Sequence, residues 1–139
     1  MRLVLDTSVM VAAVRSPTGA SAALLKASRH GVFEMLVSVG MMLEYEAVLK
    51  RPQHLAAAGL ASADIDDLLD AICVFARPVT NHYRWRPALS DPDDDLVLET
   101  AVNGNADAIV TFNQTDFARA KLLFGIQVEL PSIAIRRIR

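Results

Sequence analysis

Four acidic residues of this chain, far apart in the sequence, carry side chains that could bind a metal ion together. They are Asp6, Glu44, Asp94 and Asp116. The set contains no histidine or cysteine, and carboxylate oxygens are the ligands that a hard divalent cation such as Mg²⁺ prefers. A cation held in this way can activate a water molecule and neutralise charge that develops on a phosphate group. The sequence therefore predicts a Mg²⁺ site, provided that the fold brings these side chains together.

The elements expected around these residues form an α/β fold. Short apolar runs predict strands at 2–5, 33–38, 76–80, 107–111 and 126–130. Amphipathic or capped segments predict helices at 8–15, 20–30, 40–50, 63–75 and 92–103, with Ser62 as the N-cap of the fourth. Strands that alternate with helices indicate a parallel sheet, whose active site lies beyond the carboxyl ends of the strands. Asp6 and the segment 111–116 both follow strands, so both are expected at that edge.

Asp6 has two interpretations. It ends the first strand and precedes Thr7 and Ser8, so it can simply cap the helix that follows. A metal-binding aspartate can occupy the same kind of position. The other acidic residues must therefore decide between the two roles.

Glu44 belongs to the helix expected at 40–50, and Glu46 lies on the same helix. The apolar stripe of this helix runs through Met41, Tyr45, Val48 and Leu49. At about 100° per residue, Glu44 borders this stripe, whereas Glu46 points toward solvent. A carboxylate on a buried face needs a partner, because burying an uncompensated charge is costly. The partner can be a metal cation, or an ordinary Arg or Lys.

Asp94 lies in the acidic run that begins the helix at 92–103. Asp91 as N-cap, Pro92 at the first helical position and Asp93 in the first turn make a favourable helix start. Asp94 differs because it shares a helical phase with the apolar residues that must be buried. We therefore expect Asp94 to point inward, and Asp95 is the weaker candidate.

Asp116 follows the strand that ends at Thr111. Phe117 is expected to dock on the core, which would hold Asp116 at the rim of the site. Asn113, in the same segment, offers a neutral oxygen for a cation or its water.

The segment before the acidic run combines cationic and aromatic side chains. Arg84 and Arg86 could contact phosphates, and Trp85 could stack on the bases of a single-stranded RNA. The ordinary interpretation, a surface connection between a strand and a helix, is favoured over RNA binding.

Length and composition limit the class of protein. The 139 residues suffice for one domain with a sizeable core, and the net charge of −2 gives no overall signature of nucleic-acid binding. No apolar run reaches the roughly 20 residues of a membrane span, and Asp6 interrupts any signal-peptide pattern. A single cysteine, Cys73, excludes an internal disulfide and favours a reducing compartment. We therefore expect a cytoplasmic protein without a membrane partner.

Several motifs, in this order, resemble those of the PIN-domain nucleases, in particular the VapC-like toxins of bacterial toxin–antitoxin systems. The matching segments are Val4-Leu5-Asp6-Thr7-Ser8, Ser38 with Glu44 six residues later, 45–52, 91–95 and 106–111. Each motif is weak alone, whereas the ordered set is specific and covers almost the whole chain. The sequence is therefore similar to a single PIN-like nuclease domain spanning residues 1–139.

The resemblance implies a fold, an activity, a cofactor and partners. The fold would be a three-layer α/β/α sandwich around a parallel sheet. The activity would be that of an endoribonuclease that depends on Mg²⁺ or Mn²⁺, with RNA as substrate, inhibited by a small antitoxin and active as a homodimer or higher homo-oligomer. The acidic site would consist of Asp6, Glu44, Asp94 and Asp116, supported by Ser8 and Thr111.

One departure from the family pattern concerns Asn113, which stands where many members have an acidic residue. It affects the strength of a second metal position. The main alternative function is therefore a catalytically weak PIN-fold protein that acts as a scaffold through RNA or protein contacts. Other α/β classes fit less well. The segment after the first strand lacks the glycine-rich loop of dinucleotide-binding proteins, and it also lacks the paired D-x-D of haloacid-dehalogenase-type phosphatases.

Overall fold

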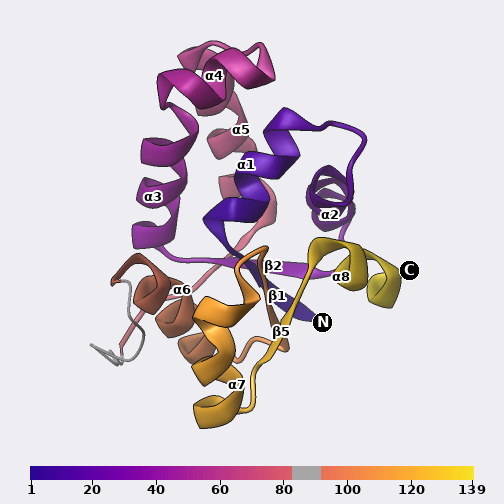
Figure 1. The fold of residues 1–139 in the computed structure, drawn as a ribbon, viewed down its shortest axis with the longest axis vertical. Helices are drawn as coiled ribbons and strands as arrows, with labels where there is room; N and C mark the ends of the chain where they lie inside the picture. Colours follow the sequence, from indigo (N-terminus) through magenta and orange to yellow (C-terminus); the bar gives the residue numbers. More distant parts are fainter. Residues whose placement is uncertain (83–91) are drawn as a thin grey trace.

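The computed structural model describes residues 1–82 and 92–139, which form a five-stranded parallel sheet with helices around it (Figure 1). The strands are β1 (Arg2–Leu5), β2 (Glu34–Val37), β3 (Arg77–Pro78), β4 (Ala108–Val110) and β5 (Gln127–Glu129). Their order in the sheet is β3-β2-β1-β4-β5, and every neighbouring pair is parallel. The strand order reverses between β1 and β4, so ligands are expected beyond the carboxyl ends of these two strands.

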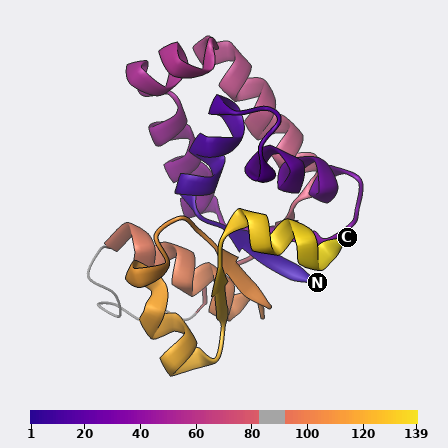
Figure 2. The same cartoon turned by 45° about the vertical axis from the view of Figure 1, so that its right-hand side comes forward.

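Helices cover both faces of the sheet, as Figures 1 and 2 show from two directions. One layer contains α1 (Thr7–Arg15), α2 (Ala20–Arg29), α3 (Val39–Leu49), α4 (Pro52–Ala58), α5 (Ser62–Phe75) and α8 (Pro131–Ile138). The other contains α6 (Pro92–Asn103) and α7 (Ala118–Phe124), which follows the short 3₁₀ helix η1 (Gln114–Phe117). The predicted three-layer α/β/α fold is therefore confirmed.

The core lies on both sides of the sheet because its central strands are apolar on both faces. Leu3, Val4 and Leu5 of β1 are fully buried, and so are all three residues of β4. This continuous burial is typical of parallel strands covered by helices on both faces. Tyr45 of α3 and Phe117 of η1 are the largest fully buried side chains among the described residues.

Most predicted elements are confirmed, but four helical segments were not predicted: α4, η1, α7 and α8. The helix predicted at 40–50 is followed by a second one, and Pro52 occupies the first turn of α4, where its missing N–H costs nothing. The prediction that Ser62 caps α5 was wrong. Ala61 is the N-cap, and the Asp64 carboxylate accepts a hydrogen bond from the Ala61 amide at 2.8 Å.

Within the described residues, none of the helices has both the length and the apolar character that crossing a bilayer requires.

Candidate active site

Asp6 lies at the carboxyl end of β1, at the point where the strand order reverses, and only 5% of it is exposed. Its Oδ1 accepts a hydrogen bond from the Thr7 amide at 2.8 Å. Its Oδ2 accepts two more, from the Ser8 hydroxyl at 2.8 Å and the Thr111 hydroxyl at 2.7 Å. The Asp6 amide donates to the carbonyl of Val110 at 2.9 Å, which fixes the end of β1 to β4. Backbone and carboxylate are therefore both held in place.

Ser8 and Thr111 are themselves oriented by backbone amides. The Phe112 amide donates to the Ser8 hydroxyl at 3.2 Å, and the Asn113 amide donates to the Thr111 hydroxyl at 2.9 Å. Because each hydroxyl oxygen accepts one of these bonds, its own proton is directed at Asp6. Chains of this kind strengthen their members cooperatively. The loop after β4 thus controls the orientation of the Asp6 carboxylate.

Asp6 is also the N-cap of α1, since its side chain accepts from the first amide of that helix. The capping interpretation of Asp6 is therefore confirmed, and it does not compete with metal binding. A carboxylate has about four lone-pair positions, and these hydrogen bonds occupy three. Among residues 1–82 and 92–139, its partners are neutral donors rather than Lys or Arg side chains.

Tyr45 links the Asp6 strand to helix α3. Its side chain is fully buried, and its hydroxyl donates a hydrogen bond to the carbonyl of Leu5, the residue before Asp6. Burial raises the pKa of the Tyr45 phenol, and the negative charge of Asp6 raises it further. The phenol therefore stays protonated and serves as a donor.

Glu44 lies on α3 and is half-buried, as is Glu46, which pairs with Lys50 at 3.4 Å. One turn before Glu44, the first turn of α3 packs closely against α6. A Cβ atom at Gly40 would lie 2.8 Å from the nearest methyl carbon of Leu96. This close approach sets the start of α3, one turn before Glu44, against the part of α6 that follows Asp94 by two residues.

Burial does not single out Asp94 in the way that helical phase predicted. Asp94 is half-buried, whereas Asp95 is only 2% exposed. Glu99, one turn later, is only 1% exposed. Helical phase does not separate the two aspartates, because every residue from Val97 to Ala101 is buried and both aspartates lie about one turn before this segment. Asp95 and Glu99 are acidic residues of this region that sequence reasoning underrated or missed.

Asp116 and Asn113 lie at the outer rim. Both are exposed, and Asp116 belongs to η1, whose Phe117 is fully buried as expected. The backbone amide of Asn113 is engaged by Thr111, so its position is fixed although its side chain faces outward.

The donor set has the chemistry of a Mg²⁺ site, but the side chains do not converge. Asp6, Glu44, Asp94 and Asp116 offer only hard oxygen ligands, and Asp6 has the supporting hydrogen bonds that ligating carboxylates usually receive. In the described parts of the chain, however, no three acidic, histidine or cysteine side chains gather closely enough to hold an ion. The fold brings their elements to one edge of the sheet, where three hydrogen bonds orient Asp6.

Some predicted residues lie outside the described ones. They are Arg84, Trp85 and Arg86, the predicted RNA contacts, and Asp91, the predicted N-cap of α6.

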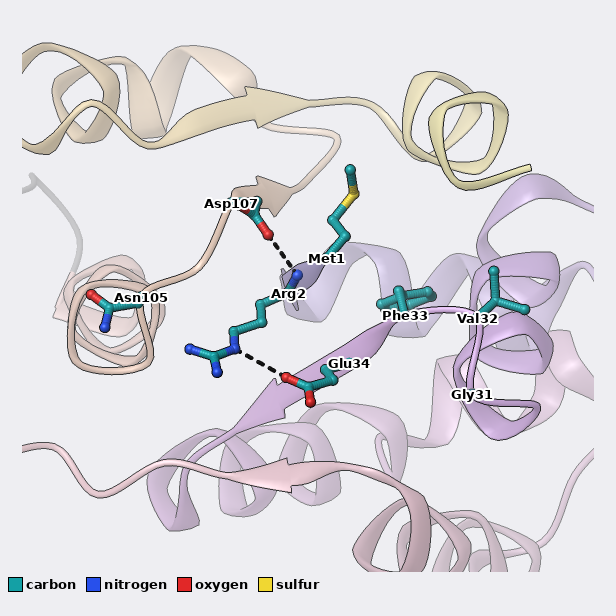
Figure 3. Close-up of a pocket in the computed structure, with 8 residues that line it drawn as sticks. All are labelled: Met1, Arg2, Gly31, Val32, Phe33, Glu34, Asn105 and Asp107. Atoms are coloured by element: carbon teal, nitrogen blue, oxygen red, sulfur yellow. Dashed lines mark hydrogen bonds and ion pairs between the residues drawn. The ribbon is translucent and has the colours of Figure 1, made fainter.

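A cavity of about 410 Å³ opens at the opposite edge of the sheet, where the strands begin (Figure 3). Its carboxylates already have partners. Glu34 accepts from Arg2 Nε at 3.0 Å, and Asp107 accepts from the Arg2 amide at 2.7 Å. None of the four predicted site residues lines this cavity. The cavity is therefore separate from the candidate site.

Comparison with known proteins identifies the family. The model of the PIN domain matches residues 2–115, most of the chain. The chain belongs to the PIN-domain family. The matched segment of this PIN domain includes Asp6, Glu44 and Asp94, and it ends one residue before Asp116.

A solved structure supports the same fold. One chain of the crystal structure of VapBC2 from Rickettsia felis, bound to a DNA fragment from their promoter, aligns with a TM-score of 0.63 at 16% identity. The alignment covers 94% of the PIN-domain chain described above and 98% of that chain. No curated protein matches the sequence.

Proposed function

We propose that this PIN-domain protein is an endoribonuclease that depends on Mg²⁺ or Mn²⁺. The observation that carries the proposal is the Asp6 carboxylate, which is buried at the strand-order reversal and oriented by the hydroxyls of Ser8 and Thr111. Hydrogen-bonded carboxylates of this kind are typical metal ligands. Membership of the PIN-domain family supports the assignment.

In the proposed mechanism Asp6 is the fixed ligand, and Glu44 and Asp94 complete the site from α3 and α6. Asp116 is the weakest of the four candidates, because its side chain is exposed on η1. The bound cation would lower the pKa of a water molecule and neutralise charge on the phosphate. Without a cation the carboxylates would repel one another and RNA. A bound cation would attract each of them, so we expect the side chains of Glu44 and Asp94 to move toward Asp6 when the cation binds.

Three assays of the purified chain with a mixed RNA pool test the activity. We expect cleavage with Mg²⁺ or Mn²⁺, loss of cleavage in EDTA, and its return when excess metal is added. Cleavage that continues unchanged in EDTA would contradict the proposal.

A matched pair of variants assigns the third acidic residue. Asp94→Asn should abolish cleavage and leave the circular dichroism spectrum unchanged, because Asp94 is half-buried. Asp95→Asn should have a lower melting temperature than the wild type, because Asp95 is almost fully buried. Below that temperature it should still cleave RNA. The reverse result would transfer the ligand role to Asp95.

We propose further that the protein is the toxin of a toxin–antitoxin pair and acts in the cytoplasm as a homodimer. The fold likeness to a chain of VapBC2 supports the toxin role. An apolar stripe on α3 supports self-association, since Val39 and Leu43, one turn apart, are 78% and 62% exposed. We expect a small open reading frame next to the gene whose co-expression suppresses toxicity, and light scattering should give twice the monomer mass.

One observation favours the alternative of a catalytically weak scaffold. Three metal-binding side chains do not gather in the described part of the chain. A scaffold would bind RNA or a protein without cleaving RNA under any metal condition, and the EDTA experiment separates the two functions.

A further inference from the structure

Tyr45 connects the two segments that carry the innermost candidate ligands. It follows Glu44 directly in α3, and its hydroxyl donates to the carbonyl of Leu5, which directly precedes Asp6. The side chain has no exposed surface. One buried hydrogen bond therefore joins the side chain next to Glu44 in the sequence to the backbone next to Asp6.

The Leu5 carbonyl lies where the sheet leaves it in need of a partner. On the β2 side the paired positions are Arg2 and Leu3, so Leu5 lies beyond them, whereas on the β4 side Leu5 is in register with Val110. On that side, the Asp6 amide already bonds Val110. Because buried carbonyls are almost always hydrogen-bonded, the Tyr45 hydroxyl completes the end of β1.

A second polar attachment of α3 lies at the beginning of the helix, farther from Glu44. Ser38 caps the helix, accepting from the Met41 amide at 3.3 Å, and its hydroxyl lies 2.9 Å from that of Thr100. These contacts fix the beginning of α3 to α6. Tyr45 instead fixes the turn that carries Glu44, and it fixes it to the strand of Asp6.

We propose that Tyr45 is a positioning residue whose hydrogen bond to Leu5 sets the separation between Asp6 and Glu44, and with it the affinity and selectivity for a divalent cation. This inference rests on the proposed function in taking these two carboxylates as ligands. Tyr45 is not a catalytic residue, because its only proton is donated to Leu5 and its side chain does not reach the surface.

The proposed role predicts a change in ion selectivity. Mg²⁺ requires near-ideal octahedral geometry at about 2.0–2.1 Å, whereas Ca²⁺ accepts flexible geometry at about 2.3–2.6 Å. A small change in the spacing of two ligands should therefore weaken Mg²⁺ binding more than Ca²⁺ binding. Loss of a supporting contact of this kind typically weakens metal binding about 10–100-fold.

The test is calorimetric titration of Mg²⁺ and Ca²⁺ into the wild type and Tyr45→Phe, which keeps the buried ring. We expect Mg²⁺ affinity to fall about tenfold or more and Ca²⁺ affinity to fall less. Ile135→Val, a buried change in α8, is the control for general loss of stability and should leave both affinities unchanged. Equal losses for the two ions, or unchanged Mg²⁺ affinity in the folded variant, would overturn the proposal.

A second measurement uses the wild type alone and does not depend on how the variant folds. The buried Tyr45 hydroxyl proton should give its own resonance in the proton NMR spectrum. Titration with Mg²⁺ should change its chemical shift, and the Kd from this titration should equal the Kd from calorimetry. A resonance indifferent to Mg²⁺ would contradict the coupling. RNA cleavage is measured separately. A wild type that binds Mg²⁺ but cleaves no RNA would refute the nuclease and leave the role of Tyr45 intact, whereas one that binds no Mg²⁺ refutes both.

Discussion

The two edges of the parallel sheet both carry carboxylates, but they hold them in different ways. Where the strands begin, Glu34 lies between two guanidiniums, with Arg2 at 3.0 Å and Arg77 at 3.2 Å. Where the strands end, Asp6 is held by neutral donors, namely one amide and the hydroxyls of Ser8 and Thr111. The first arrangement neutralises the charge, whereas the second orients the carboxylate without neutralising it.

This difference separates a carboxylate that the fold neutralises from one that it orients and leaves charged. Glu34 is about half-exposed, and ion pairs at the surface contribute little to stability. Asp6 is buried, and a buried charge without a cationic partner is costly unless something else compensates it. Three hydrogen bonds supply part of that compensation, and under the proposed function a divalent cation would supply the rest. The cavity of Figure 3 lies at the edge where Glu34 is paired with two guanidiniums, and none of the four candidate ligands lines it.

The strongest test of this comparison exchanges one carboxylate for an amide at each edge. Asp6→Asn removes the charge and turns an NH₂ group toward hydroxyls that already point their protons at it. We expect RNA cleavage to fall by more than about 100-fold, the upper range for loss of a mere supporting contact. Initial rates with saturating Mg²⁺ measure the effect.

Asp107→Asn is the matched control at the other edge, since Asp107 accepts only from the Arg2 amide among the described contacts. It should cleave RNA at the wild-type rate. Similar losses in both variants would show that the two edges do not differ in function.

Much of the fold could be predicted because its signals are local. The apolar runs of β1, β2 and β4 and the proline and acidic residues that begin α6 appear in the sequence itself. β3 has only two residues, both exposed, so its sequence carries little signal. α4 was missed because a proline that ends one helix also suits the first turn of the next.

The site was less predictable because its decisive contacts join distant residues. Thr111 and Ser8 were expected as supporting residues, but their shared acceptor, Asp6 Oδ2, depends on the pairing of β1 with β4. Tyr45 was placed in an apolar stripe, and its hydroxyl contact with Leu5 spans 40 positions. Helical phase cannot reveal such a contact, nor the burial of Asp95.

A smaller effect should follow from removing one orienting hydroxyl. Thr111→Val preserves the shape of a fully buried side chain but deprives Asp6 of a donor and the Asn113 amide of its acceptor. Mg²⁺ affinity should fall about 10–100-fold, and the unfolding free energy should fall by about 1–3 kcal/mol. Calorimetry and urea denaturation measure the two quantities.

Thr100→Val provides the control for chemistry and burial. Thr100 is also fully buried, and its hydroxyl bonds the Leu96 carbonyl and lies next to Ser38. We expect a similar loss of stability with little loss of Mg²⁺ affinity. Equal affinity losses would mean that rigidity in general, rather than the orientation of Asp6, governs the site.

Two glycines that lie close to neighbouring side chains, Gly40 and Gly104, extend the comparison. A Cβ at Gly40 would lie 2.8 Å from a methyl carbon of Leu96, which can rotate away, whereas one at Gly104 would meet Leu36, Val79 and the Thr100 carbonyl at 2.7–3.0 Å. Gly104→Ala should therefore cost about 1–3 kcal/mol of stability and spare Mg²⁺ binding. Gly40→Ala should be nearly neutral for stability, because Leu96 can rotate away and alanine favours the helix. The rotation of Leu96 disturbs α6 two residues after Asp94, and it should weaken Mg²⁺ binding severalfold. Thermal unfolding measures the stability of both variants, and calorimetric titration measures their affinity for Mg²⁺.

The smallest effect belongs to the exposed ion pairs, and its pH dependence identifies it. The hydrogen bond from Arg2 is the largest cause that lowers the pKa of Glu34, and the charge of Arg77 adds to it. Because the folded pKa lies below the ordinary value of 4.5, Glu34 stabilises the fold above that pH, and its contribution is lost as the pH falls through the folded pKa. Glu34→Gln should therefore melt slightly earlier than the wild type at neutral pH, and the difference should disappear on acidification. The variant should cleave RNA normally, because the Glu34 carboxylate of the wild type is already neutralised by Arg2 and Arg77. A persistent difference at low pH would assign the effect of Glu34 to packing instead of charge.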